Sequence, residues 1–266
     1  MLRARLATAA VALPSLFWLI FSGPNWAFAG LIVAVTAIGL FEFVGMSAPE
    51  HRGSQAFSIL AGLLFAGTVI LHRTDALGLV LCLVLAVGLI LALADPDMRG
   101  AVDRLAHSLL AALYVGLFLP HAVRLHALPE GGPRWVFFVI ACTMAADTAA
   151  YFGGRFAGKT KLFPRVSPNK TVEGAIAALG GALLIAWLVA WLLPPPGLTM
   201  GSALWLGLII WILSQTGDMI ESMLKRAYDT KDSGWILPGH GGVLDRIDAL
   251  VLPFVFTYYW NTGLGL

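Results

Sequence analysis

The chain has 266 residues, of which 59% are hydrophobic and only 12% are charged, and its formal net charge is +2. A soluble domain carries about 25% charged residues and needs a polar surface, so this composition excludes a soluble globular protein, and equally a disordered, collagen-like or coiled-coil chain. The composition therefore predicts an all-α, polytopic integral membrane protein, and the length allows roughly eight to ten spans of about 20 residues.

Uncharged stretches predict nine transmembrane helices in one membrane domain that covers residues 1–266. Their expected ranges are 6–22, 24–46, 56–71, 76–94, 105–123, 134–152, 172–193, 199–224 and 246–263. Three consecutive prolines at 194–196 separate the seventh span from the eighth. The basic and then apolar start of the chain also resembles a cleavable signal peptide, but cleavage there would not change the orientation of the later spans.

Basic residues are distributed very unevenly over the two sides that nine spans define. With a cytoplasmic N-terminus, fourteen of the seventeen lysines and arginines fall on the cytoplasmic side, and the other three are Arg73, Arg124 and Arg134. The positive-inside rule therefore predicts that the loops 153–171 and 225–245 lie in the cytoplasm. We expect the membrane to be the inner (plasma) membrane of the cell. We interpret residues 1–130 as hydrophobic N-terminal helices and residues 131–266 as the catalytic half. The expected partners include membrane lipids but no nucleic acid.

Carboxylates at helix ends point to a metal site. Asp218 lies about 10 Å along a helix from Lys225 and the expected headgroup level, where a carboxylate must be paired, bind a metal or face a polar cavity. Asp245 and Asp248 share one face at the start of the last span. Oxygen ligands without cysteine favour Mg²⁺, so we expect these three aspartates to hold the metal and to be catalytic. The alternatives are a structural charge network, an N-cap role for Asp245 and a purely structural Glu221.

Cations and glycines lie between these carboxylates. Lys225 and Arg226 are expected to act in catalysis, because lysine and arginine neutralise phosphate charge, while glycines leave backbone N–H groups available to anions. The expected substrate-binding residues of this segment are Lys231, Asp232, Gly239, His240, Gly241 and Gly242. His240 is either a phosphate donor or acid–base group, or a residue that only caps a turn.

The earlier polar loop supplies three more candidates. Residues 153–160 match the P-loop pattern, but a P-loop needs a preceding strand, and here a membrane span precedes it, so the match is a decoy. The basic residues of the loop are either phosphate ligands or ordinary positive-inside charge. Lys170 is predicted at the mouth of the site, and Ser167 and Asp147 are further substrate-binding candidates. Either Ser167 or Thr171 begins the next helix.

The second half of the chain resembles a known family. The pattern that carries the resemblance is Ser222-Met-Leu-Lys225-Arg226-x4-Lys231-Asp232-x-Gly234-x-Ile236-Leu237-Pro238-Gly239-His240-Gly241-Gly242-x2-Asp245-Arg246-x-Asp248. It is similar to the signature of the phosphatidate cytidylyltransferases, the CDP-diacylglycerol synthases. Residues 147–174 also resemble that family's other cytoplasmic loop. The first half resembles the family only in hydropathy, so no site is carried over there.

The resemblance implies that CTP and phosphatidate react to CDP-diacylglycerol and pyrophosphate in a reaction that depends on Mg²⁺. A two-metal arrangement is one option, in which a monovalent cation such as K⁺ can replace one Mg²⁺. The resemblance also implies a homodimer. The residues independently suit this chemistry, because two highly anionic groups must meet and cations stabilise that charge. The alternatives are another CDP-lipid-handling transferase and a cation-coupled transporter. A transporter would also bury Asp218 and Glu221, but it would not require the glycine-rich loop.

Overall fold

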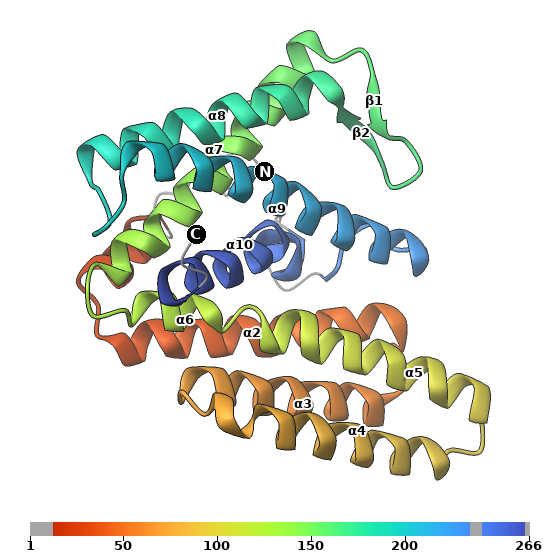
Figure 1. The fold of residues 1–266 in the computed structure, drawn as a ribbon. Helices are drawn as coiled ribbons and strands as arrows, with labels where there is room; N and C mark the ends of the chain where they lie inside the picture. The colour runs from red at the N-terminus through yellow and green to blue at the C-terminus, as the bar shows by residue number, and fades with distance from the viewer. Residues whose placement is uncertain (1–12, 235–240, 264–266) are drawn as a thin grey trace. The chain divides into compact units, whose positions relative to one another are not determined.

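The computed structural model describes residues 13–234 and 241–263 of the chain. Its contacts form two compact units, one made by residues up to Arg124 and by residues 230–246, the other by residues 125–229 and 247–266. Almost all regular structure in both units is helical, as the composition predicted (Figure 1). Residues 230–246, which were expected in the catalytic half, pack within the first unit.

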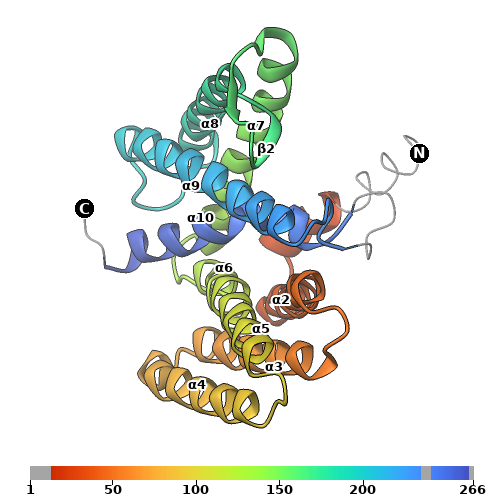
Figure 2. The same ribbon diagram turned by 90° about the vertical axis from the view of Figure 1, so that its right-hand side faces the viewer.

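The first unit is a set of helices packed around α3. After helical residues 13–21 it contains α2 (Asn25–Ser47), α3 (Arg52–Ile70), the short 3-10 helix η1 (Thr74–Ala76), α4 (Leu77–Leu93), α5 (Met98–Ala111) and the π-helical turn η2 (Ala112–Leu117). The helices α2, α4 and α5 all contact α3 (Figure 2). Phe65 of α3 lies at the centre of the core, together with Val84 of α4 and Ala112 of η2.

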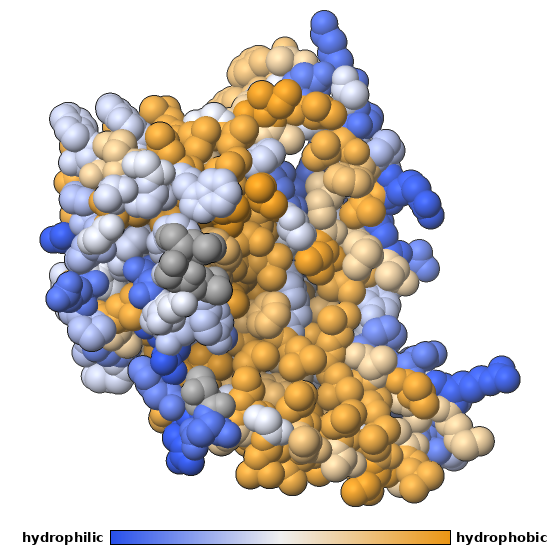
Figure 3. Space-filling model, viewed as in Figure 1, coloured by the Kyte–Doolittle hydropathy of each residue, from blue (hydrophilic) through white to orange (hydrophobic). Residues whose placement is uncertain are grey.

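The outer surface of this unit is apolar. Leu79, Ile90 and Leu93 of α4 are 63%, 66% and 84% exposed. Figure 3 shows hydrophobic side chains gathered over α3 and α4. A soluble monomer rarely exposes a continuous apolar face of this kind, whereas lipid covers it in a membrane. The chain is therefore an integral membrane protein.

The fifth predicted span, 105–123, begins too late. The helix α5 starts at Met98, because Asp97 is its N-cap and accepts a hydrogen bond from the Gly100 N–H at 3.1 Å. The span predicted from hydropathy left out the first turns of this helix, because those turns contain charged residues. The π turn that follows brings Gly116 so close to the backbone of Gly62 that a Cβ would not fit. The short helix α6 (His121–His126) comes next.

The second unit contains the helices that surround the polar residues. Its elements are α7 (Gly132–Ala157), β1 (Lys161–Phe163), β2 (Ser167–Thr171), α8 (Val172–Leu192) and α9 (Met200–Ala227). The last helix, α10 (Leu244–Thr262), begins in the first unit and continues in the second. The strands form an antiparallel hairpin within the predicted loop 153–171.

Small residues allow α7 and α8 to pack closely. A Cβ at Gly153 would collide with Ala177, and one at Gly181 would meet the backbone of Ala145. Such approaches are typical of membrane helix pairs. Residues 153–157 lie inside α7, whereas a P-loop forms a turn between a strand and a helix. The match to the P-loop pattern is therefore coincidental, as predicted. Gly153 is there for helix packing.

The opposite ends of these helices also meet. Arg134, at the start of α7, donates from Nη1 to the carbonyl oxygen of Pro194 at 3.1 Å, and Gly131 packs against Pro196. The start of α7 and the proline turn after α8 therefore lie side by side. The contact is consistent with the predicted topology, which assigns both segments to the same side of the membrane.

Six helical stretches are long and apolar enough to cross a membrane in the described part of the chain. They are α2, α3, the stretch Met98–His126, α7, α8 and α9, while α4 is apolar but shorter. The predicted count of nine spans is therefore not confirmed. Helices α7 and α9 also extend beyond the predicted spans, to Ala157 and Ala227, because charged helical turns can project past the apolar layer.

Candidate active site

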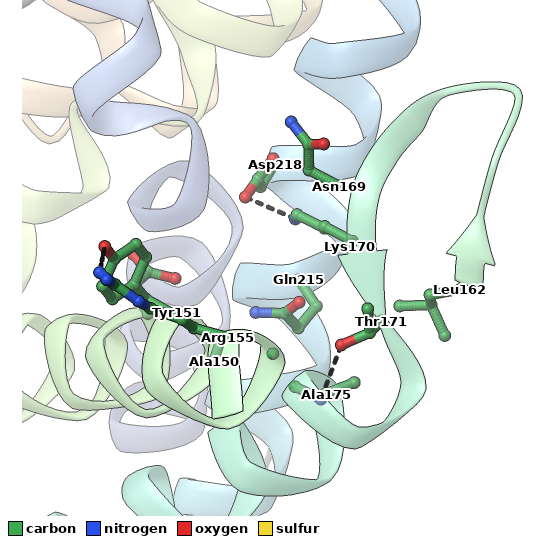
Figure 4. A pocket seen from close by; sticks show the side chains of 13 residues that line it. Ala150, Tyr151, Arg155, Leu162, Asn169, Lys170, Thr171, Ala175, Gln215 and Asp218 are labelled. Atoms are coloured by element: carbon green, nitrogen blue, oxygen red, sulfur yellow. Dashed lines mark hydrogen bonds and ion pairs between the residues drawn. The ribbon is translucent and has the colours of Figure 1, made fainter. Parts of the chain in front are cut away.

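A cavity of about 560 Å³ opens between α7, the β-hairpin, the start of α8 and α9 in the second unit. We call it the α7–α9 cavity, and its polar or charged lining residues are Asp147, Tyr151, Arg155, Asn169, Lys170, Thr171, Gln215 and Asp218. Figure 4 shows Lys170 reaching from β2 to Asp218 on α9, with Gln215 one turn earlier on the same helix. The cavity is within the usual size range of small-ligand sites.

Two carboxylates line this cavity, and a third from another helix interacts with them. Asp218 of α9 forms an ion pair with Lys170, with 2.5 Å between Oδ2 and Nζ. Asp147 of α7 and Asp248 of α10 both lie close enough to Asp218 to interact with it electrostatically. Asp248 comes this close because Gly217 packs directly against the backbone of α10, where a Cβ would collide with the Asp248 carbonyl oxygen.

A second ion pair lies one turn further along α9. Glu221 is 1% exposed, and its Oε2 lies 2.5 Å from Nζ of Lys225. Lys225 also interacts electrostatically with Asp248. Lys225 therefore stabilises buried carboxylates in this structure, and its predicted role at a substrate phosphate stays a prediction.

The charge balance of this cluster suits a divalent cation. In their ionised forms, its members are four carboxylates and two ammonium groups, with a formal charge of −2: Asp147, Asp218, Glu221, Asp248, Lys170 and Lys225. Within the described residues, no three His, Cys, Asp or Glu side chains lie close enough to hold a metal by themselves. Mg²⁺ does not need such a cage, since it commonly takes one or two carboxylates and completes its shell with water and substrate phosphates. The oxygen donors present fit Mg²⁺.

Local interactions position Lys170. Thr171 is the N-cap of α8, and its hydroxyl oxygen accepts a hydrogen bond from the Gly174 N–H at 3.1 Å. This settles the alternative between Ser167 and Thr171, because Ser167 lies at the start of β2. Glu173 accepts hydrogen bonds from the backbone N–H groups of Lys159 and Thr160 and so connects the start of the hairpin to the start of α8.

The start of α10 is organised within the first unit. The helix begins at Leu244, so Asp245 lies in its first turn and the N-cap alternative is wrong. Its Oδ2 instead accepts hydrogen bonds from the N–H groups of Ser233 and Gly242, at 3.1 and 2.9 Å, and from the Ser233 hydroxyl. Asp248 follows one turn later on the same helix.

The predicted site residues thus fall into three groups. The second unit brings together Asp147, Lys170, Asp218, Lys225 and Asp248. Outside that cluster, five residues lie in the first unit: Asp245, Gly241, Gly242 and the exposed Lys231 and Asp232. Arg226 is exposed in the last turn of α9, and Ser167 is half-buried at the start of β2. Gly239 and His240 lie outside the described residues, so nothing is said of their placement.

The sequence analysis missed several polar residues. Tyr151, Asn169 and Gln215 line the α7–α9 cavity, together with Arg155, which the sequence analysis had left open between a phosphate ligand and positive-inside charge. Gln215 was detectable, because it is a polar amide inside an otherwise apolar span, three residues before Asp218. Glu42 was missed although it is the one charged residue of α2 and is only 3% exposed. An intramembrane carboxylate is a functional candidate wherever it occurs in the chain.

Comparison with known proteins identifies the family of this chain. A family model described as the cytidylyltransferase family matches residues 3–262. A phosphatidate cytidylyltransferase of Synechocystis sp. is 35% identical over 291 residues, covering 96% of this chain and 95% of that protein. One of Brucella suis biovar 1 is 36% identical over 268 residues, covering 98% and 93%. One of Bacillus subtilis is 39% identical over 159 residues, covering 59% and 58%. The chain belongs to the cytidylyltransferase family.

Proposed function

We propose that this protein is a phosphatidate cytidylyltransferase, which makes CDP-diacylglycerol and pyrophosphate from CTP and phosphatidate. In this reaction a phosphate oxygen of phosphatidate attacks the α-phosphorus of CTP, and the bond from that phosphorus to the β-phosphate oxygen breaks. Family membership and the names of its relatives support the activity. The observation that carries the proposal at the structural level is the charged cluster at the α7–α9 cavity, inside an otherwise apolar chain.

The cluster suits a reaction between two anions. The Lys170 ammonium lines the cavity and would bind a substrate phosphate, and Arg155 lies in the same lining. Asp218 and Asp248, with Asp245 one turn earlier on α10, are the proposed metal-binding residues. Bound Mg²⁺ would neutralise phosphate charge and polarise the α-phosphoryl group. The amides of Asn169 and Gln215 would orient a substrate, since neither has a hydrogen-bond partner among the described residues.

The proposed setting is the cytoplasmic face of the inner membrane. There CTP would arrive from the cytosol, and phosphatidate would enter sideways from the inner leaflet. The contact between Lys170 and Asp218 supports this, because it joins the hairpin to the part of α9 that precedes its basic end. We also propose a homodimer, to be tested by native mass spectrometry of the protein in detergent.

The proposal is tested with purified protein in detergent micelles that contain phosphatidate. CTP labelled at the α-phosphate should transfer its label to the lipid fraction, whereas CTP labelled at the γ-phosphate should release it as pyrophosphate. Diacylglycerol in place of phosphatidate is the control, because it lacks the attacking phosphate. Label transfer to diacylglycerol would indicate another transferase, and no transfer to either lipid would overturn the proposal.

The metal requirement is measured in the same assay. Chelation with EDTA should abolish label transfer, and Mg²⁺ should restore it, because the cluster cannot by itself neutralise the phosphates that meet there. Exchange of K⁺ for choline in the buffer tests the additional monovalent cation. Full activity in excess EDTA would contradict the proposed role of Mg²⁺.

A further inference from the structure

Glu42 lies in the half of the chain where the sequence pointed to no site. It is the one charged residue of α2, it is 3% exposed, and apolar residues surround it in the sequence. A buried carboxylate is costly unless hydrogen-bond donors surround it. Its contacts therefore indicate what it does.

Both ends of the glycine-rich segment 234–242 contact this carboxylate. After the segment, the Val243 N–H donates to Oε1 at 3.0 Å and the Leu244 N–H donates to Oε2 at 2.8 Å. Before the segment, the Ser233 hydroxyl lies 3.5 Å from Oε2. Glu42 thus joins the two ends of the segment and also satisfies the first N–H groups of α10, which lie just over two hundred residues away in sequence.

Asp245 takes part in the same network. Its Oδ2 accepts hydrogen bonds from the Ser233 and Gly242 N–H groups, and the Ser233 hydroxyl lies 3.0 Å away. A hydroxyl group has one hydrogen, so Ser233 donates to either Asp245 or Glu42 at any moment. Two carboxylates therefore divide the donors at the start of α10 between them, where the helix dipole favours negative charge.

Two glycines of the family pattern, Gly234 and Gly242, lie where a larger side chain would not fit. A Cβ at Gly234 would collide with Oε1 of Glu42, and a Cβ at Gly242 would collide with the Ser233 hydroxyl and approach Oε2 of Glu42. The two ends of the segment therefore approach the Glu42 carboxylate closely. Glycine at both positions follows from that approach.

We infer that Glu42 is a positioning residue for the proposed cytidylyl transfer. It holds the two ends of segment 234–242 together, and it accepts the hydrogen bonds of the first N–H groups of α10. Asp245 is therefore not needed as the cap of this helix. Without Glu42, the Val243 and Leu244 N–H groups would lose their acceptor. Asp245, the carboxylate nearest in sequence, would then be drawn into capping and away from its present orientation. The inference rests on the proposed function, because Asp245 is a proposed metal-binding residue there.

The test compares Glu42→Gln and Glu42→Ala with Thr36→Val. Glutamine retains one acceptor oxygen of the two, and alanine retains none. Thr36 is the matched control, since it is buried in the same helix and its hydroxyl bonds only to the Ile32 carbonyl oxygen. The first measurement is limited trypsin cleavage after exposed Lys231, relative to cleavage after exposed Lys161 in the hairpin. The second is the Mg²⁺ dependence of kcat, expressed per folded protein.

We expect cleavage after Lys231 to accelerate about tenfold in Glu42→Ala and less in Glu42→Gln, without a change at Lys161, because only the ends of the segment are released. The Mg²⁺ concentration for half-maximal activity should rise in the same order. A loss of thermal stability with wild-type Mg²⁺ dependence and wild-type kcat would overturn the inference, as would unchanged cleavage. If the wild-type protein makes no CDP-diacylglycerol, the proposed function fails, while selective cleavage still tests whether Glu42 holds the segment.

Discussion

At the scale of single residues, acids in apolar helices were the informative signal. Asp218 was predicted to need a partner or a cavity, and the structure provides both, because Lys170 pairs with it at the α7–α9 cavity. The same physical argument applies to Glu42, which the sequence analysis left aside because no family pattern surrounded it. Burying a charged side chain costs free energy whether or not the residue belongs to a recognised motif.

Neutralising the proposed metal-binding residues should remove activity without unfolding the protein. Asp218→Asn and Asp248→Asn preserve size but remove charge, so label transfer from CTP should fall about 100-fold or more, as expected when transition-state charge loses its stabilisation. Thr216→Val is the control on α9, because the Thr216 hydroxyl is exposed and bonds only to the Ile212 carbonyl oxygen. Near-normal turnover of both asparagine variants at ordinary Mg²⁺ concentration would contradict the assignment.

Lys170 should act on substrate affinity. Lys170→Met removes a charge-assisted contact, so the KM for an anionic substrate should rise about tenfold or more. Lys161→Met is the matched control: Lys161 is exposed in the same hairpin and does not line the cavity. A wild-type KM in both variants would mean that Lys170 serves only as the ion-pair partner of Asp218 and does not bind substrate.

At the scale of secondary-structure elements, the helices were predictable and their ends were not. Hydropathy located α8 to within a residue at each end, but it placed the end of α9 three residues early and the start of α5 seven residues late. Caps such as Asp97 and Thr171 set the true boundaries, and hydropathy does not report on caps. The hairpin β1–β2 was missed because its strands are very short and carry no alternating apolar pattern.

Loss of the α8 cap should affect stability and activity together. Thr171→Val removes the acceptor for the Gly174 N–H, so the free energy of unfolding should fall by about 1 kcal/mol. Thr171→Ser retains the hydroxyl and should behave like wild type. Thr199→Val removes the corresponding cap of α9, away from the cavity, and should cost similar stability while it leaves kcat unchanged. Thermal unfolding in detergent and the label-transfer assay separate the two effects, and a wild-type thermal midpoint in Thr171→Val would exclude a stabilising cap.

At the scale of the whole molecule, topology decides whether the polar segments can cooperate. The positive-inside distribution predicts that the hairpin and the segment after α9 face the cytoplasm, while the proline turn 194–196 faces outward. Within the second unit, contacts of Arg134 with Pro194 and of Lys170 with Asp218 join segments that were assigned to the same side.

Cysteine labelling tests this topology directly. Cys82 and Cys142 are first replaced by alanine, and single cysteines are then introduced at Thr160, Lys231 and Leu198. A membrane-impermeant thiol reagent should modify positions 160 and 231 only from the cytoplasmic side and position 198 only from the outside. Modification of positions 160 and 231 from opposite sides would mean that the number of spans between them is odd, and a shared site could not then form.

The sequence by itself determined the membrane class, the approximate position of most helices, and the aspartates and lysines that carry the proposed chemistry. These follow from local properties, since hydropathy and the cost of an intramembrane charge are read from neighbouring residues. Only the tertiary structure decided which distant groups meet: Lys170 with Asp218, and Glu42 with the start of α10. Such pairings depend on helix packing between segments that lie far apart in sequence, and no local pattern encodes them.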